Sequence, residues 1–127
     1  MAAETVSKYR HSLKDLPLIA PNASIRAKMI ASDELLMSFI ECPPETDLAM
    51  HSHEAMQVLI VLEGSLDHNV GDESFHLEAG DVVLHPSNIV HGGYSKTGFK
   101  GLDIFVPPRE DYLDLMRRHG LPTPTLK

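Results

Sequence analysis

The chain has 127 residues, a formal net charge of −7 at pH 7 and a hydrophobic content of 43%. This length suffices for one hydrophobic core and is too short for two ordinary domains. The acidic excess comes without a cluster of Lys and Arg, which argues against nucleic acid or an anionic membrane surface as a partner, because both attract basic proteins.

Cysteine usage and apolar runs bear on the compartment. Cys42 is the single cysteine, so the sequence predicts no internal disulfide and fits a reducing compartment. No apolar run approaches the ~20 residues of a membrane span, and the N-terminus lacks the charged and then apolar layout of a signal peptide. We therefore expect a cytoplasmic protein without a membrane partner.

Residues 1–24 are predicted to form an N-terminal arm, and residues 25–127 a single domain. Pro17 and Pro21 disfavour helix in the residues before them, so this segment reads as extended. Arms of this kind cover a sheet edge, either their own or that of a partner. Together with the exposed edges expected of short strands, the arm predicts a homodimer.

A β pattern begins at Ile25. Alternating apolar residues and turns predict strands over 25–29 and 36–40. The next stretch, residues 46–64, contains two histidines separated by one residue, His51 and His53. In a strand, these side chains point to the same side.

Gln57 has the same parity as the two histidines and opens an apolar run over 58–62, which predicts a buried strand. If the chain folds back near Glu54, the three polar side chains line one concave surface. Further along, His68 shares a face with apolar neighbours, and we leave open whether it is a hydrogen-bonded core residue or lines a pocket. His85 precedes Pro86, and its place stays open between the opening of the interior and a dimer surface.

His91 begins a further strand after a turn at Pro86. Imidazole nitrogen is a good ligand for several divalent transition metals, and a site with few protein ligands keeps positions open for water or substrate. Inward histidines are costly unless they bind something. The sequence therefore predicts a divalent metal site that takes nickel, zinc, iron or manganese. Its ligands are His51, His53, Gln57 and His91.

The last strand of the pattern covers residues 102–106. Asp103 and Phe105 alternate there with Leu102, Ile104 and Val106. The apolar trio takes the core face if only one face is buried, and Asp103 is then a surface residue. If the outer face is covered as well, Asp103 points into the cavity, where it needs a partner or a function.

Residues 109–120 carry helix start and stop signals in order, with acidic residues in the first turn, basic residues in the last, and Gly120 at the end. Tyr112, Leu115 and Met116 form the expected packing face. Arg109 opposes the helix dipole, so its position needs another reason. Either an anionic ligand or an ion pair with Asp111 supplies one.

The histidine stretches resemble the paired motifs of the cupins, which implies an all-β antiparallel barrel or jelly roll, here with a short C-terminal helix. The chain departs from the motifs at Glu45, Gln57, Asn88 and Ser95, and Gln57 occupies the position of the acidic ligand. The matching positions are His51, His53, Gly64, Gly80, Pro86 and His91.

The stretch from Asp103 to Leu113, near the end of the chain, resembles the corresponding stretch of single-domain cupins that linearise unsaturated uronates. This resemblance implies a metal held by three His and a Gln, with Asp103, Phe105 and Arg109 facing the substrate. An amide ligand leaves the metal's full charge to hold an acid and act as a Lewis acid. We therefore expect Asp103 to move protons, Arg109 to bind an anion and Phe105 to form an apolar wall.

These roles amount to hydration or ring opening of a uronate by a lyase or isomerase. Two other functions stay open on the sequence. One is an iron dioxygenase, for which three histidines on such a barrel are a sufficient ligand set. The other is a non-catalytic module that binds a metabolite.

Overall fold

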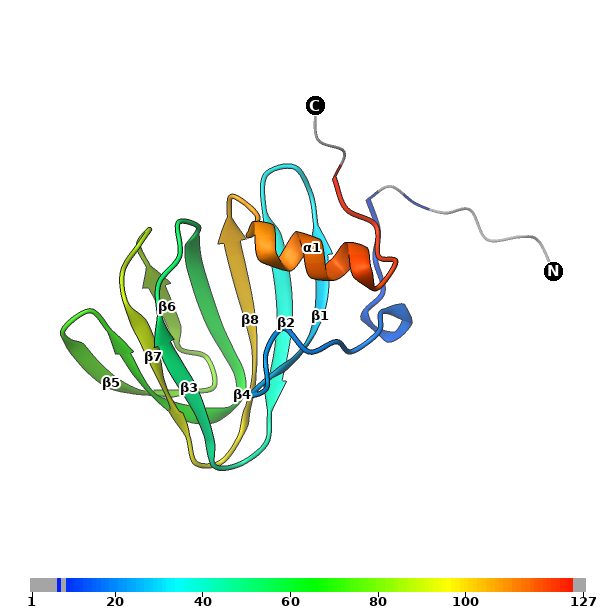
Figure 1. Cartoon of the computed structure of the whole chain (residues 1–127). Helices are drawn as coiled ribbons and strands as arrows, with labels where there is room; N and C mark the ends of the chain where they lie inside the picture. The colour runs from blue at the N-terminus through cyan, green and yellow to red at the C-terminus, as the bar shows by residue number, and fades with distance from the viewer. Residues whose placement is uncertain (1–6, 8, 125–127) are drawn as a thin grey trace.

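The computed structural model describes residue 7 and residues 9–124. Residues 1–6 and 8 of the predicted arm, and residues 125–127 of the predicted domain, lie outside this range. Within it, the chain forms eight strands, a 3-10 turn and one α-helix (Figure 1). The elements are η1 Leu13–Asp15, β1 Arg26–Ala31, β2 Leu36–Cys42, β3 Thr46–His51, β4 Met56–Val70, β5 Glu73–Glu78, β6 Val82–His85, β7 His91–Ser95, β8 Phe99–Val106 and α1 Glu110–Arg118. The predicted all-β fold with a short C-terminal helix is confirmed.

The strands form one curled antiparallel sheet with the order β1-β2-β8-β4-β7-β3, and β5 and β6 also pair with β4. The first part of β4 pairs with β8 and β6, and its last part pairs with β7 and β5. In Figure 1, β3, β7 and β5 lie on one side of the molecule, and β8, β2 and β1 on the other. The long strand β4 therefore joins two halves that enclose an interior.

The bend in β4 depends on Gly64. The register with β8 shifts between Val61 and Glu63, and Gly64 follows with a φ of 78°. A Cβ at this position would collide with the carbonyl oxygen of Gly98. Only glycine combines this backbone conformation with so close an approach. The glycine of the first motif thus lets one strand serve both halves of the sheet.

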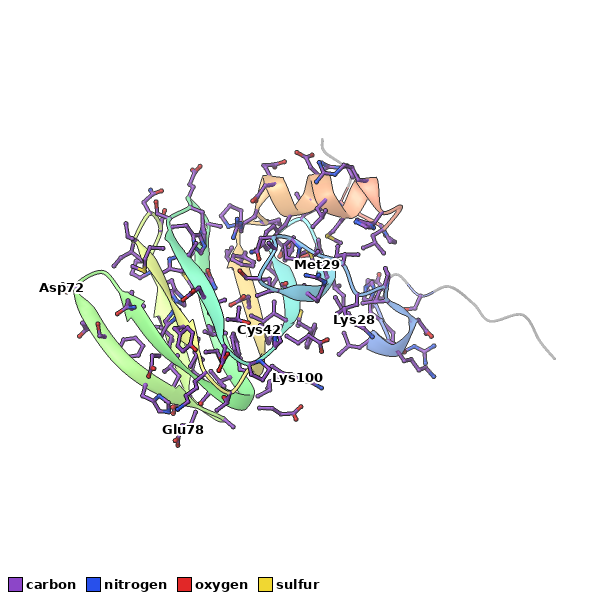
Figure 2. The ribbon with its side chains drawn as sticks, turned by 60° about the horizontal axis from the view of Figure 1, so that its bottom comes forward. Lys28, Met29, Cys42, Asp72, Glu78 and Lys100 are labelled. Carbon is purple, nitrogen blue, oxygen red and sulfur yellow. The ribbon has the colours of Figure 1, made fainter. Side chains whose placement is uncertain are left out.

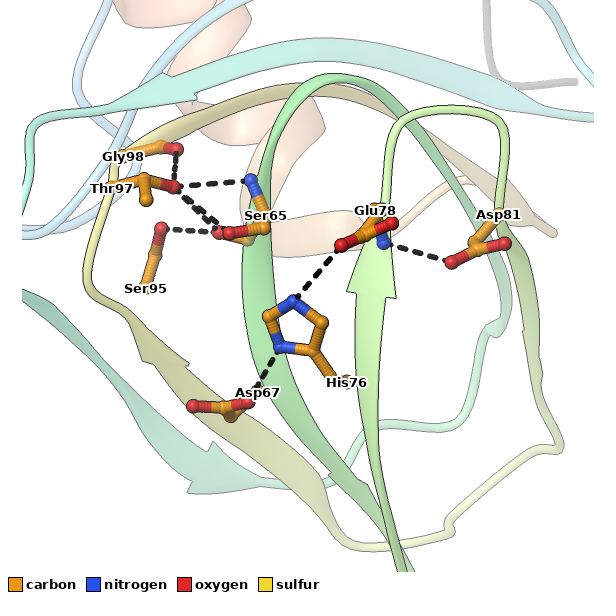
Figure 3. Close-up of polar contacts among 8 residues, drawn as sticks. All are labelled: Ser65, Asp67, His76, Glu78, Asp81, Ser95, Thr97 and Gly98. Carbon is orange, nitrogen blue, oxygen red and sulfur yellow. Dashed lines mark hydrogen bonds and ion pairs between the residues drawn. The ribbon is translucent and has the colours of Figure 1, made fainter.

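Hydrogen bonds from the β7–β8 connection hold the same corner (Figure 3). The Ser65 backbone N–H donates to Thr97 Oγ1 over 3.2 Å, and Thr97 Oγ1 donates to the Gly98 carbonyl over 2.8 Å. The buried Ser95 hydroxyl donates to the Ser65 carbonyl over 2.7 Å. The side chains therefore satisfy backbone groups that the bend removes from the regular ladder.

The interior receives apolar side chains from both halves and from α1. The helix buries Tyr112, Leu113 and Met116, whereas Leu115, which the pattern placed on the packing face, is only half-buried. The helix begins one residue later than predicted and ends at Arg118. Acidic residues occupy its first turn and basic residues its last, as the helix dipole favours.

We call the part of the sheet formed by β1, β2, β8, β6 and the first part of β4 the first half. Its outer face is apolar as well. In the run 58–62, which the pattern made a buried strand, Leu59 and Val61 are buried, but Leu62 is 49% exposed. Val82 and Leu84 of β6 also point outward and are exposed. Alternation across a two-sided apolar strand explains why the run looked continuous in the sequence.

The described part of the arm covers the free edge of β1. Ile19 and Ala27 exchange backbone hydrogen bonds of 2.8 and 2.7 Å, and the Ile19 side chain is buried. The Lys28 ammonium donates to the Leu13 carbonyl over 2.7 Å, and Figure 2 shows Lys28 beside this segment. The arm thus protects an edge of its own sheet. Among the described residues, no helix is long and apolar enough to cross a membrane.

Candidate metal centre

Three histidines meet at one end of the interior. His51 ends β3, His91 begins β7, and the two residues are paired in the β3–β7 ladder. His53 approaches them from the turn before β4. The nitrogens that these three side chains offer as ligands all lie within 4.8 Å of one another. The fold therefore brings the three predicted histidine ligands together.

His53 reaches this position by a route that differs from the expected one. The strand ends at His51, after a register shift that follows Leu48, so alternation along one strand does not align the two histidines. The turn itself holds His53. Its carbonyl accepts the Asn88 N–H over 2.8 Å, and its Nδ1 bonds the Ala55 carbonyl over 2.7 Å.

Backbone carbonyls set the tautomer of all three rings. Nδ1 of His51, His53 and His91 lies 2.8, 2.7 and 2.9 Å from a carbonyl oxygen. A carbonyl only accepts, so each Nδ1 carries the proton and each Nε2 keeps a lone pair. The carbonyls belong to Ala49, Ala55 and Ile89, respectively. This arrangement orients imidazoles as metal ligands.

Gln57 adds a fourth acceptor. Its amide nitrogen donates to Asp103 Oδ1 over 2.6 Å, which turns Oε1 toward His53 Nε2 at 3.0 Å. Because the His53 proton is on Nδ1, the two atoms in this contact are both acceptors, and no hydrogen lies between them. A cation between them removes the repulsion. Burial is the largest influence on the pKa of His53 and lowers it, so a proton on Nε2 is disfavoured.

His91 supports the same conclusion. Its Nε2 is buried and has no hydrogen-bond partner among the described residues. Burial lowers its pKa to about 4, so the ring is neutral at pH 7 and the lone pair is free. An unpaired buried acceptor costs about 1–3 kcal/mol. Three imidazole nitrogens and one amide oxygen fit a divalent transition metal that keeps open coordination positions.

The site opens into a cavity of about 370 Å³. Asp103 and Phe105 on β8 point into it and are buried, while Leu102 and Ile104 are half-buried on the other face. The structure thus selects the cavity placement of Asp103 over the surface placement. Burial raises the pKa of its carboxyl to about 7, against the hydrogen bond from Gln57 and the charge of Arg109.

Arg109 lies at the cavity wall just before α1. Its Nη2 and Nε donate to the two Asp111 carboxylate oxygens over 2.7 and 3.1 Å, so the predicted ion pair is present. Its guanidinium carbon lies 3.9 Å from the ring centre of Tyr112 and 5.2 Å from that of Phe105. The aromatic rings and the carboxylate hold the cation in place. Arg109 and His53 also line a second hollow of about 460 Å³.

Two more buried histidines lie beside the metal centre. His85 Nδ1 donates to the Gln57 carbonyl over 3.2 Å, which leaves its Nε2 to accept the His68 Nε2 hydrogen over 2.7 Å. His68 lines the cavity, and His85 is fully buried behind it, so neither of its two expected positions is correct. Burial lowers the pKa of each ring to about 4. Inward parity had pointed to His68, but no local signal pointed to this pair.

A comparison with known protein families matches the part of the chain that contains both histidine stretches. The Cupin domain family matches residues 38–105, which is more than half of the chain. The chain is a cupin. Its matched segment begins in β2, ends in β8 and contains every candidate metal ligand.

Individual proteins resemble this cupin more distantly. An RmlC-like cupin from Shewanella frigidimarina superposes with a TM-score of 0.78 at 27% identity, over 84% of this chain and 96% of that one. KdgF from Halomonas sp. superposes with a TM-score of 0.74 at 21% identity, over 79% and 95% of the two chains, which shows the shared fold. The H2HPP isomerase of Bacillus subtilis is 25% identical over 99 residues. That alignment covers 69% of this chain and 41% of the relative.

Proposed function

We propose that this cupin is a metal-dependent lyase or isomerase that acts on a small carboxylate-bearing substrate. The observation that carries the proposal is the grouping of three histidine nitrogens within 4.8 Å of one another, with the Gln57 amide oxygen 3.0 Å from His53 Nε2. These four groups come from His51, His53, Gln57 and His91. A divalent metal held by neutral ligands keeps its full charge, binds acidic oxygens and acts as a Lewis acid.

Asp103 is the residue we propose for proton transfer. Its carboxyl is buried at the cavity wall, and Gln57 occupies Oδ1 with a hydrogen bond of 2.6 Å. This bond fixes the orientation of the carboxyl and leaves Oδ2 to exchange a proton with the substrate. The link through Gln57 also sets the distance between the proton-transfer group and the metal centre.

Arg109 and Phe105 are proposed to position the substrate. The Arg109 side chain is only 14% exposed, and its guanidinium faces the cavity from the side of α1. It offers a bidentate contact to an acid group when it releases Asp111. Phe105 is almost fully buried beside His53, with the ring centres 5.5 Å apart, and forms an apolar wall.

An unsaturated uronate is one carboxylate substrate to test, because the ending from Asp103 to Arg109 resembles uronate-linearising cupins. The metal-loaded protein is incubated with the unsaturated uronate released by a pectin or alginate lyase, and the loss of ultraviolet absorbance is followed. We expect a rate above that of the spontaneous reaction. A rate equal to the spontaneous one removes the uronate and leaves other carboxylate substrates.

An iron dioxygenase is the alternative enzyme, favoured by the set of three imidazoles. Its prediction differs in one measurable quantity, which is the uptake of dissolved oxygen after iron and substrate are added. The neutral ligand set argues against it, because anionic ligands stabilise high-valent iron better. Tight ligand binding without any turnover would instead support a non-catalytic module.

We also propose that the protein is a homodimer in the cytoplasm. The free Cys42 thiol fits a reducing compartment. Large apolar side chains, with Leu62, Val82 and Leu84 among them, are exposed on the outer face of the first half-sheet. This face carries no charge at these positions, so two copies of a chain with a net charge of −7 meet there with little repulsion. Light scattering should give a dimer, and Leu84→Glu should shift it toward the monomer.

A further inference from the structure

We infer that the substrate joins its acid head group to an apolar ring or short apolar chain. This inference rests on the proposed function, because it assumes that the acid lies at the metal centre. It comes from the cavity itself, which has two chemically different ends. The polar end is lined by His51, His91, Gln57, Asp103, Arg109 and Tyr112.

The other end, here called the apolar compartment, is formed by strands β2, β3, β4 and β8 and by the residue just before β1. Its lining residues are Ile25, Ile40, Leu48, Leu59, Leu66 and Phe99. Five of the six side chains are buried, and Leu48 is half-buried. They come from four strands and the segment before β1, which the curled sheet brings together around one space.

Strand β8 links the two ends. Its inward positions run from Phe105 and Asp103 through Gly101 to Phe99. Asp103 and Phe99 are four residues apart, which corresponds to about 13 Å along a strand. Phe105, Asp103 and Phe99 line the cavity, whereas Leu59 and Phe99 pack over Gly101. The acid end and the apolar compartment are therefore parts of one cavity.

Three polar residues line the cavity outside its polar end: Asn22 and Ser24 from the arm, and His68 from β4. His68 lies two residues from Leu66 on the same inward face, and its buried Nδ1 has no partner among the described residues, so it offers one acceptor to a ligand. Asn22 Oδ1 already accepts the backbone N–H groups of Ser24 and Ile25 over 2.8 and 3.1 Å. A sugar ring carries several hydroxyls, and each loses water when it enters such a space without a partner. An apolar ring loses none and gains the burial of its surface.

The cavity size agrees with this class of substrate. A volume of about 370 Å³ lies at the small end of the range of about 300–1,000 Å³ for ligand pockets. It leaves room for one acid head group and one ring. The structure thus favours an acid with an apolar substituent over an acid of equal size that is polar throughout.

Three commercially available acids test the inference by isothermal titration calorimetry on the metal-loaded protein. Pyruvate has the acid head group alone, phenylpyruvate adds an apolar ring, and galacturonate has a polar ring. We expect phenylpyruvate to bind at least tenfold more tightly than either of the others, because even one added methylene in an apolar pocket is worth roughly tenfold or more. Equal or tighter binding of galacturonate overturns the inference.

A variant that narrows the compartment tests its location. Leu48→Phe should weaken phenylpyruvate binding at least fivefold and leave pyruvate binding and metal content unchanged. Leu18→Phe, at an exposed position of the arm outside the cavity lining, is the matched control and should change the binding of neither acid. If Leu48→Phe does not fold, Leu48→Asn makes the same test by placing an amide in the compartment. Phenylpyruvate affinity that is the same in wild type and in the folded Leu48 variant overturns the inference.

The same titrations separate this inference from the proposed function. If none of the three acids binds to the metal-loaded protein, the proposed function fails, and the inference fails with it. If pyruvate and phenylpyruvate bind equally well, the proposed function stands and the apolar compartment is not a substrate site. In metal-stripped protein both acids should bind more weakly. Phenylpyruvate should still bind more tightly than pyruvate, because the apolar contacts do not involve the metal.

Discussion

Two groups of histidines lie side by side in this cupin and have different hydrogen-bond arrangements; burial increases from exposed His51 through half-buried His53 to buried His91 in the first group, and both members of the second are buried. In the first group, His51, His53 and His91 each give the Nδ1 proton to a backbone carbonyl, so three Nε2 lone pairs converge. In the second group, His68 and His85 bond each other through Nε2 over 2.7 Å. Burial alone therefore does not make a histidine a ligand. Neighbouring carbonyls fix which nitrogen carries the proton: three Nε2 lone pairs face one another in the first group, whereas in the second the His85 lone pair accepts a hydrogen and the buried His68 Nδ1 has no partner among the described residues.

The difference has a structural cause. Each ligand histidine bonds a carbonyl two residues away in its own chain segment, so local backbone geometry presets the tautomer. The second pair depends on the pairing of β4 with β6, which places His85 opposite Gln57. We expect the first group to bind metal and the second to contribute to the core and to hold the backbone of Gln57.

Metal content tests this division most directly, and here the largest effect is expected. A His51→Ala, His91→Ala double variant should lose the bound metal, because it removes two of four donors. The control is a His76→Ala, His119→Ala double variant, which removes two exposed histidines. Elemental analysis of protein purified without a His tag measures both. Equal and negligible metal in wild type and the His51, His91 variant would refute the site.

Removal of the Asp103 carboxylate should reduce turnover by roughly 10²- to 10⁴-fold, the usual contribution of general acid–base catalysis. Asp103→Asn keeps an oxygen for the Gln57 hydrogen bond, so the metal centre should remain intact and binding should change little. Steady-state kinetics with an acid that the protein converts measures turnover, and calorimetry measures binding. A loss of binding that matches the loss of turnover would assign Asp103 to positioning.

Acid should destabilise the metal-free protein between pH 6.5 and 4. Burial lowers the pKa of His68, His85 and His91 from 6.5 to about 4. In this window the unfolded chain binds protons that the folded chain excludes. The three neutral histidines therefore contribute fully to the free energy of unfolding above pH 6.5, and this contribution is lost as the pH falls toward 4. Asp103, whose pKa burial raises to about 7, acts in the opposite direction, but it is one group against three.

Urea unfolding at several pH values measures this loss. One pKa unit corresponds to about 1.4 kcal/mol, so we expect a decrease in the free energy of unfolding of a few kcal/mol. His68→Leu should flatten the curve. The control is His76→Gln, because the hydrogen bond from exposed His76 to Asp67 raises the pKa of His76 (Figure 3). Stabilisation by His76 is present at low pH and lost at high pH, so the acid-side decrease should survive in the control.

Arg109→Ala should have the smallest effect, a loss of acid binding of roughly tenfold. Arg109 belongs to neither histidine group, so metal content should not change. Asp111→Asn is a useful partner variant, because it frees the guanidinium from a bidentate ion pair and should tighten acid binding. Calorimetric titration with one carboxylate ligand compares both variants with wild type. Unchanged affinity in Arg109→Ala would remove the anion contact from the proposed site.

The sequence alone was enough to predict the all-β fold, the strands over 25–29, 36–40, 58–62 and 102–106, the C-terminal helix and the three histidines that meet. These features depend on local properties: alternation, turn-forming residues, helix caps and motif spacing. Gln57 was predicted from its parity with the histidines, but a turn separates it from His53, and its role as a metal ligand stays a prediction. The metal itself, its identity and the catalytic roles of Asp103, Phe105 and Arg109 stay predictions.

Tertiary structure decided what depends on contacts between distant segments. The apolar residues of β8 could not show which face is inward, because the outer face of this half-sheet is apolar too. His53 is placed by a turn and not by a strand, and His85 meets His68 only through the curl of β4. The apolar compartment likewise joins side chains from elements far apart in sequence. Parity assigns a residue to a face, whereas only the closed fold determines what that face encloses.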